Sequence, residues 1–154
     1  MTYRILGLDP TPFQPLFGLP DADLARHGAI RMRVDERHAY PDRIEVRDAE
    51  PGEHVLLLNH AYLDVDNPYR GTHAIFVREG ATRALDVRDT VPDALRRRLL
   101  SVRAFDAASM MVDAEVVQGT ELEPLVERFF ANPAVHFLQV HHARRGCYAA
   151  RIER

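Results

Sequence analysis

Three residues near the C-terminus have the types needed for covalent or acid–base chemistry. Cys147 is the single cysteine of the chain, and it follows an Arg-Arg-Gly run that brings positive charge close to its thiol. Positive charge favours the thiolate, which is the nucleophilic form of cysteine. If residues 135–141 and 147–152 form a hairpin, His141 or His142 lies opposite the thiol and can act as its base. The catalytic candidates are therefore Cys147, His141 and His142, and the alternative is a small buried cysteine without a chemical role.

A polar stretch over residues 59–73 is the candidate binding segment. Loops of this length inside a compact domain are uncommon and often functional. The stretch holds Tyr69 and Arg70, which suit an aromatic wall and a bidentate clamp for an anion, and it is bracketed by His60 and His73. We expect a ligand pocket between this loop and the C-terminal hairpin. In the alternative, Tyr69 simply packs and Arg70 pairs with an acid at a turn.

The sequence predicts no metal and no cofactor. None of the 8 histidines forms a His-x-His or His-Glu-x-x-His pattern, and one cysteine excludes a multi-cysteine zinc site. Adjacent His141 and His142 point to opposite faces of a strand and cannot chelate one ion together. A metal site would have to combine His60 or His73 with one of that pair and an aspartate. All 20 basic residues are arginine, so Schiff-base and P-loop lysine chemistry are excluded.

Composition places the chain among ordinary globular proteins. It has 154 residues, of which 46% are apolar and 28% charged, and this predicts a single compact domain over residues 1–154. The net charge of -3 argues against a nucleic-acid partner. The chain has no apolar run long enough to cross a membrane and no signal peptide at its start, so a cytoplasmic protein is expected.

Hydrophobic periodicity predicts an α+β fold. Apolar segments predict strands, by alternation with charged residues at 30–34 and 43–47 and by a continuous apolar run at 54–58. The complete set of predicted strands is 3–8, 30–34, 43–47, 54–58, 74–78, 84–87, 102–107, 110–117, 135–141 and 147–152. Turn and stripe patterns predict helices over residues 20–28, 90–100 and 120–131. Helices and strands are not interleaved, which favours a largely antiparallel or mixed sheet with two to three helices.

Several short segments, in order along nearly the whole chain, resemble a bacterial family known as domain of unknown function 1203. They are Asp-Ala-Glu-Pro-Gly-Glu at 48–53 with the leucine-rich strand after it, Asn-Pro-Tyr-Arg at 67–70 before 74–77, and residues 102–107, 111–114, 146–148 and 153–154. The family has no assigned activity, so the resemblance implies none. Its members often carry a cysteine near Pro-Asp-Arg at 41–43. This chain has Asp42 there, so the resemblance also implies that a two-cysteine site with Cys147 is absent.

Three functions remain open from the sequence. The favoured hypothesis is a domain that binds a small anionic ligand between the 59–73 loop and the C-terminal hairpin. The second is an enzyme that uses Cys147 or a histidine-bound metal. The third is a non-catalytic interaction module or homodimer that pairs through the strand over residues 135–141.

Overall fold

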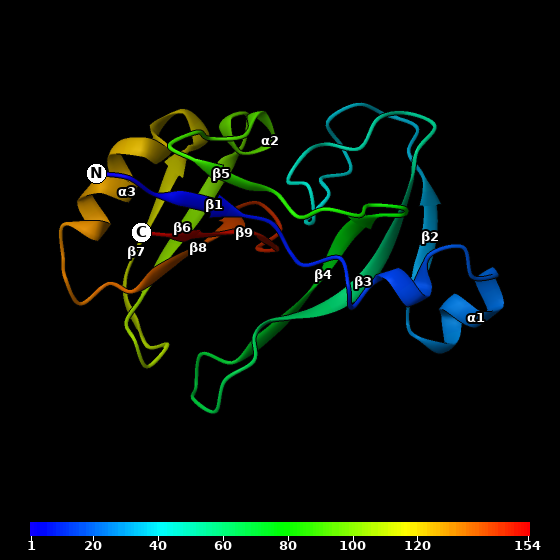
Figure 1. Cartoon of the computed structure of the whole chain (residues 1–154), viewed down its shortest axis with the longest axis horizontal. Coiled ribbons are helices and arrows are strands. Elements are labelled where there is room, and N and C mark those ends of the chain that lie inside the picture. Colours follow the sequence, from blue (N-terminus) through cyan, green and yellow to red (C-terminus); the bar gives the residue numbers. More distant parts are fainter.

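Two antiparallel β-sheets lie side by side in the structure, a computed structural model that describes residues 1–154 (Figure 1). The larger sheet has the strand order β5-β1-β9-β8-β6-β7, and the smaller has the order β2-β3-β4. The larger sheet consists of β1 (Arg4–Leu6), β5 (Asp86–Arg88), β6 (Leu99–Phe105), β7 (Met111–Gln118), β8 (Phe137–His142) and β9 (Tyr148–Glu153). The smaller consists of β2 (Ile30–Arg33), β3 (His54–Leu63) and β4 (Gly71–Arg78).

Three short α-helices complete the fold and confirm the predicted α+β class with antiparallel sheets. They are α1 (Asp21–Arg26), α2 (Asp93–Arg96) and α3 (Leu122–Phe130), with 3₁₀ turns at Gln14–Leu16 and Gly119–Glu121. None of these helices is long and apolar enough to cross a membrane.

Helix α3 covers one face of the larger sheet and forms the main core. Its predicted apolar stripe is buried, and it packs with inward residues of β6 and β8. Each fully buried apolar side chain of this kind contributes about 1.5–3 kcal/mol. The spacing of Thr120 and Glu123 fits a capping box, but the box does not form, because Thr120 lies in the preceding 3₁₀ turn and Glu123 pairs with Arg96 instead. The core stripe comprises Leu122, Leu125, Val126, Phe129 and Phe130.

Two predicted elements are wrong. Residues 43–47 do not form a strand, because the backbone groups of Arg43 and Ile44 bond to Leu8 and Leu85 in an irregular segment. The alternation that suggested a strand reflects burial of the apolar residues there, but Arg43 is buried as well. The helix predicted over residues 90–100 is only α2, because the chain enters β6 at Leu99.

The predicted loop over residues 59–73 is mostly strand. β3 continues through Leu63 and β4 begins at Gly71, so only residues 64–70 form the connecting turn. His60 and His73 are direct cross-strand partners in this hairpin. The turn reaches the larger sheet, where the Asn67 amide donates to the carbonyl oxygen of Ser109 at 3.0 Å. The polar composition of the stretch belongs to a hairpin that crosses from one sheet to the other.

The strand predicted to pair with a second chain is in the middle of the larger sheet. β8 lies between β6 and β9 and is buried along its whole length, so the prediction of a free edge at residues 135–141 is wrong. The long exposed edge is β7. Its outward amides at Ala114 and Val116 donate to the carboxylates of Asp113 at 2.8 Å and Glu115 at 3.1 Å. These side chains occupy the backbone donors that another strand would need.

Removing both carboxylates is expected to expose this edge. The double variant Asp113→Ala/Glu115→Ala frees the amides and removes the negative charges beside the exposed Val112 and Val116. We expect its sedimentation coefficient to rise with concentration, whereas that of the wild type stays constant. The double variant Glu36→Ala/Asp66→Ala is the control, because it removes the same charge at exposed positions outside β7. Equal self-association of both variants would show that net charge, and not the edge, controls association.

Candidate functional site

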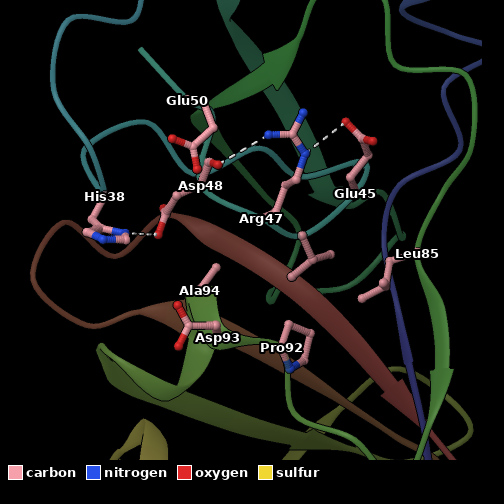
Figure 2. A pocket seen from close by; sticks show the side chains of 10 residues that line it. His38, Glu45, Arg47, Asp48, Glu50, Leu85, Pro92, Asp93 and Ala94 are labelled. Carbon is pink, nitrogen blue, oxygen red and sulfur yellow. Dashed lines mark hydrogen bonds and ion pairs between the residues drawn. The ribbon is translucent and has the colours of Figure 1, made fainter. Parts of the chain in front are cut away.

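A shallow cleft lies between the irregular segment 38–50 and the chain that leads into α2. Its volume is about 360 Å³, within the range of small-molecule sites. Figure 2 shows His38, Asp48 and Glu50 on one wall, with Pro92, Asp93 and Ala94 opposite them. The lining residues are His38, Glu45, Val46, Arg47, Asp48, Glu50, Leu85, Pro92, Asp93 and Ala94.

Asp48 is the anchor of the first wall. Its side chain is only 9% exposed. The Arg98 guanidinium donates to both carboxylate oxygens of Asp48, at 2.6 and 3.2 Å. His38 Nδ1 lies 3.3 Å from Asp48 Oδ2 (Figure 2). A charge-assisted fork of this kind fixes both partners. The exposed segment around residue 38 is therefore tied to the end of α2.

Backbone strain marks the same wall. His38 and Val46 adopt positive φ angles of 59° and 51°. A left-handed conformation is unusual for any residue except glycine, and most of all for a β-branched one. Each residue in such a conformation lowers the stability of the folded protein by about 1–3 kcal/mol. The conformation is kept only where contacts from the surrounding structure hold the backbone in place. The wall is therefore held in shape by its contacts and not by local preference.

The charges of the cleft are mainly negative. Four carboxylates line it against the single guanidinium of Arg47. Arg47 itself donates to both oxygens of Glu53 at 2.9 Å, which lowers the pKa of Glu53 to about 2. The carboxylates with the most accessible side chains are Glu50 at 61% and Asp93 at 74%. This arrangement favours a cationic group over an anion in the cleft.

A buried polar group lies on the other side of segment 42–46. Arg43 is 2% exposed. Its Nε donates to the Tyr148 carbonyl at 2.7 Å, and its Nη1 donates to the Pro41 carbonyl at 2.5 Å. Burial lowers the pKa of Arg43, and Cys147 acts in the opposite direction.

Asp42 does not neutralise this guanidinium by direct contact. Its carboxylate accepts the backbone amides of Glu45 and Arg78, both at 2.6 Å. Burial raises the pKa of Asp42, while these amides and that of Ile44 oppose the rise. Arg43 forms no ion pair with any carboxylate of the chain. A buried guanidinium in this state is electrostatically incomplete unless another anion adjoins it.

The two adjacent histidines are buried in different surroundings. His141 packs edge-on against Tyr62 and Tyr148, with its Nδ1 3.0 Å from the Gly146 carbonyl. That carbonyl can only accept, so Nδ1 carries a proton. Burial, followed by the charge of Arg103, lowers the pKa of His141 to about 4.

His142 has no partner for its ring Nδ1, although the residue is only 8% exposed. Burial, then the charges of Arg43 and Arg98, lower its pKa to about 3. Its backbone amide donates to the Cys147 carbonyl at 2.8 Å, so the two residues lie opposite one another in the terminal hairpin. His142 is therefore a neutral imidazole at pH 7 whose buried Nδ1 has no hydrogen-bond partner.

The predicted binding residues separate into two groups. His60 and His73 contact the terminal hairpin, His60 through the Tyr148 ring at 5.7 Å and His73 Nε2 through the Arg145 carbonyl at 3.0 Å. Burial and then the charge of Arg43 lower the pKa of His60. Tyr69 and Arg70 lie instead at the hairpin turn. Tyr69 packs edge-on against Phe105, and Arg70 forms an exposed ion pair with Asp64 at 3.2 Å.

Sequence reasoning missed the residues that hold the site together. Arg43 has a place in an alternating pattern that predicts an exposed side chain. Arg98 belongs to a triple-arginine run that reads as a solvated helix face, yet its side chain is 18% exposed and bound to Asp48. No periodicity distinguishes these arginines from the other 18. Their partners are distant in sequence, so only the tertiary fold identifies them.

No group of three or more His, Cys, Asp and Glu side chains is placed to hold a metal ion. Comparison with known proteins identifies the family of the chain. No curated protein and no solved structure matches the chain. The family model described as "Protein of unknown function (DUF1203)" matches residues 39–154, which include segment 39–50 of the cleft, the buried Arg43 and the terminal hairpin. The chain therefore belongs to the DUF1203 family.

Proposed function

We propose that the protein is a small-molecule-binding domain and that the cleft between segment 38–50 and α2 is its ligand site. The observation that carries the proposal is a concave surface of about 360 Å³ with an apolar floor and convergent polar groups. Val46, Leu85, Pro92 and Ala94 supply the apolar surface. The wall that contains Asp48 is held in shape by its ion pair with Arg98. This supports the proposal, because a preorganised site loses less conformational entropy when it binds a ligand.

The charge of the cleft favours an amine attached to a small apolar body. Glu50 is held only by Arg37 at 3.8 Å. Asp93 accepts Arg97 Nε and Nη2 at Oδ2, at 2.9 and 2.5 Å, but its side chain is 74% exposed, so its Oδ1 and the Glu50 carboxylate can accept an ammonium group at the rim. The apolar floor would receive the carbon chain. This differs from the anionic ligand expected from the 59–73 stretch, where Arg70 is already paired with Asp64.

A matched ligand series tests the proposal. Thermal-shift measurements would compare primary alkylamines with alkylcarboxylates of equal chain length at the same ionic strength. We expect the amines to raise the melting temperature and the carboxylates to have no effect. Backbone amide NMR shifts should then change for residues 45–50 and 92–94.

The rim carboxylates provide the variant and its control. Glu50→Gln/Asp93→Asn should reduce amine affinity by about tenfold or more, the loss of at least one charge-assisted hydrogen bond. Glu36→Gln/Asp66→Asn removes the same charge elsewhere and should bind as the wild type does. Equal losses in both variants would reject the cleft as the site. Binding of carboxylates that depends on Tyr69 and Arg70 would support the anion site at the hairpin turn instead.

A further inference from the structure

Arg103 of β6 is a half-buried arginine without an ion pair. Its Nε donates to Ser101 Oγ at 3.4 Å, and its Nη1 lies 3.5 Å from His141 Nε2. Both contacts are at the long end for a hydrogen bond. Most of the donors of this guanidinium are therefore free to bind another group.

The surface beside Arg103 is open to solvent. In the strand register, Ser101 and Arg103 lie opposite Val116 and Ala114 of β7, so these four side chains share one face of the sheet. Val116 is 54% exposed, and Ala114 is exposed as well. Helix α3 covers the other face, where Val102 belongs to the main core. A ligand from solution can therefore reach the Arg103 guanidinium and the Ser101 hydroxyl.

Both ring nitrogens of His141, which lies opposite Ser101 on β8, face acceptors. Nδ1 lies 3.0 Å from the Gly146 carbonyl oxygen, and Nε2 lies 3.1 Å from Gln139 Oε1. The orientation of the Gln139 amide is fixed, because its nitrogen donates to the Tyr62 carbonyl at 2.8 Å. A neutral imidazole has one N–H and can satisfy only one of the two acceptors. The hydrogen-bonding geometry therefore fits the protonated ring.

The charges around the ring oppose its protonation. The rings of Tyr62 on β3 and Tyr148 on β9 pack edge-on against it and are uncharged. Burial, followed by the charge of Arg103, lowers the pKa of His141 to about 4. An anion at Arg103 would offset that charge. The other charged or titratable groups that act on the ring are His73 of β4, Arg43 of segment 42–46 and the adjacent His142.

The turn over residues 143–146 adds further positive charge beside the ring. Its Arg144 and Arg145 are exposed, and neither forms an ion pair. The turn is held to both sheets, because the Arg145 carbonyl contacts His73 and the Gly146 carbonyl contacts His141. Cations without carboxylate partners therefore gather here in a chain whose net charge is -3. Such a surface attracts anions.

We propose that Arg103 and Ser101 bind a doubly charged oxyanion, a phosphate or sulfate group, and that binding is coupled to protonation of His141. The guanidinium offers a fork for two oxygens, and the hydroxyl offers one further donor. When His141 Nε2 gains a proton it donates to Gln139, and the Arg103 Nη1 beside it is released to the anion. Guanidinium and imidazolium together match two negative charges, whereas a monocarboxylate matches one. None of these residues lines the cleft, so this site does not depend on the amine proposal.

The pH dependence of sulfate binding tests the coupling. Sulfate stays doubly charged between pH 7.5 and pH 5.5, so its own titration does not contribute. If the bound anion returns the pKa of His141 from about 4 to the ordinary 6.5, binding takes up a proton at pH 5.5. Calorimetric titration at constant ionic strength in chloride should then show about tenfold tighter binding at pH 5.5 than at pH 7.5. An equal affinity at both pH values, or no saturable binding, would overturn the proposal.

Ring-nitrogen NMR of the wild-type protein identifies the histidine that takes up the proton. At pH 5.5, His141 should show one protonated nitrogen in chloride and two in saturating sulfate. Protonation of His73 alone, whose two nitrogens also lie near carbonyl oxygens at 2.8 and 3.0 Å, would overturn the proposal.

Two arginines separate a specific site from general positive charge. Arg103→Gln should weaken sulfate binding by about tenfold or more, through loss of charge-assisted hydrogen bonds. Arg88→Gln is the control and should bind as the wild type does, because Arg88 is exposed and lies on β5 at the opposite edge of the sheet. Equal losses in both variants would reject Arg103 as the anchor. If Arg103→Gln does not fold, the ring NMR of the wild type decides.

The source of the oxyanion is distinguished by comparing inorganic phosphate with phenyl phosphate at pH 7.5. Both should bind more weakly in Arg103→Gln than in Arg88→Gln. Tighter binding of phenyl phosphate assigns the site to a phosphate ester, and tighter binding of inorganic phosphate assigns it to the free ion. Binding of either that is unaffected by Arg103→Gln would overturn the proposal.

Discussion

Lowering the pH from 7.5 to 5 is expected to remove about 4 kcal/mol of folding stability, mainly through His141 and His142. Their pKa values in the folded protein are about 4 and about 3, whereas an unfolded histidine has the ordinary value of 6.5. Both pKa values are depressed, so the unfolded state binds protons more strongly. The stability is fully present above pH 6.5 and is lost as the pH falls towards the folded values. Each histidine contributes about 2 kcal/mol at pH 5.

Urea denaturation at intervals from pH 7.5 to pH 5 measures this effect. A total stability of about 5–15 kcal/mol is usual for a domain, so the midpoint should fall steeply. His142→Asn keeps a neutral polar side chain and should remove about half of the pH dependence. His136→Asn changes an exposed histidine and serves as the control. A stability that stays constant from pH 7 to pH 5 in the wild type would show that these histidines accept protons without unfolding.

The same two residues show where sequence reasoning succeeds. Period-two alternation places His141 and His142 on opposite faces of a strand, and the structure confirms the terminal hairpin at β8 and β9. It also confirms the helix at α3, whose apolar stripe is long enough to be unambiguous. Local patterns succeed here because one element buries one face. They do not show that His141 would be buried, since its burial depends on Tyr62 of β3.

The β3–β4 hairpin shows a case in which the sequence pattern does not reveal the strands. Residues 59–73 contain few apolar side chains, so their composition is typical of a loop. In the structure, β3 and β4 pair through this stretch, and the Tyr62 carbonyl accepts the Gln139 amide at 2.8 Å. Polar strands are stable there because the other sheet supplies partners. Contacts of this kind between two sheets produce no hydrophobic periodicity in the sequence of either segment.

The cleft was not predicted from the sequence, because none of the predicted site residues lines it. The 59–73 stretch was expected to lie near the terminal hairpin, and the structure does place His60 and His73 against that hairpin. Arg43 was not predictable, because its side chain is buried by contacts to Tyr148, more than a hundred positions away. The pattern around it, with Ile44 and Val46 alternating with charges, fits an exposed arginine equally well. The role of such a buried arginine can be identified only from the tertiary structure.

Gly7→Ala is expected to cost about 3–5 kcal/mol of stability, because Gly7 has no room for a side chain. A Cβ atom added at Gly7 would overlap the Ile44 carbonyl oxygen and lie 2.8 Å from its carbonyl carbon. Gly7 and Leu85 are linked by a backbone hydrogen bond of 2.9 Å, and Leu85 in turn bonds to Ile44 at 2.8 Å. Relief of the overlap must therefore move the backbone that separates the cleft from Arg43. A flexible side chain could move away from the added Cβ, but the overlapping atoms belong to the hydrogen-bonded backbone of Ile44.

Gly52→Ala gives the matched control for this prediction. Gly52 has a φ of 93°, and a Cβ there meets nothing within 4 Å, so the substitution introduces only conformational strain. That strain costs about 1–2 kcal/mol. Urea denaturation of both variants at pH 7.5 should show the larger loss for Gly7→Ala, together with NMR shift changes at residues 43–46 and 85. If the two variants lose equal stability, β1 does not pack against segment 43–46, and the cleft wall must be held by the Asp48–Arg98 contact alone.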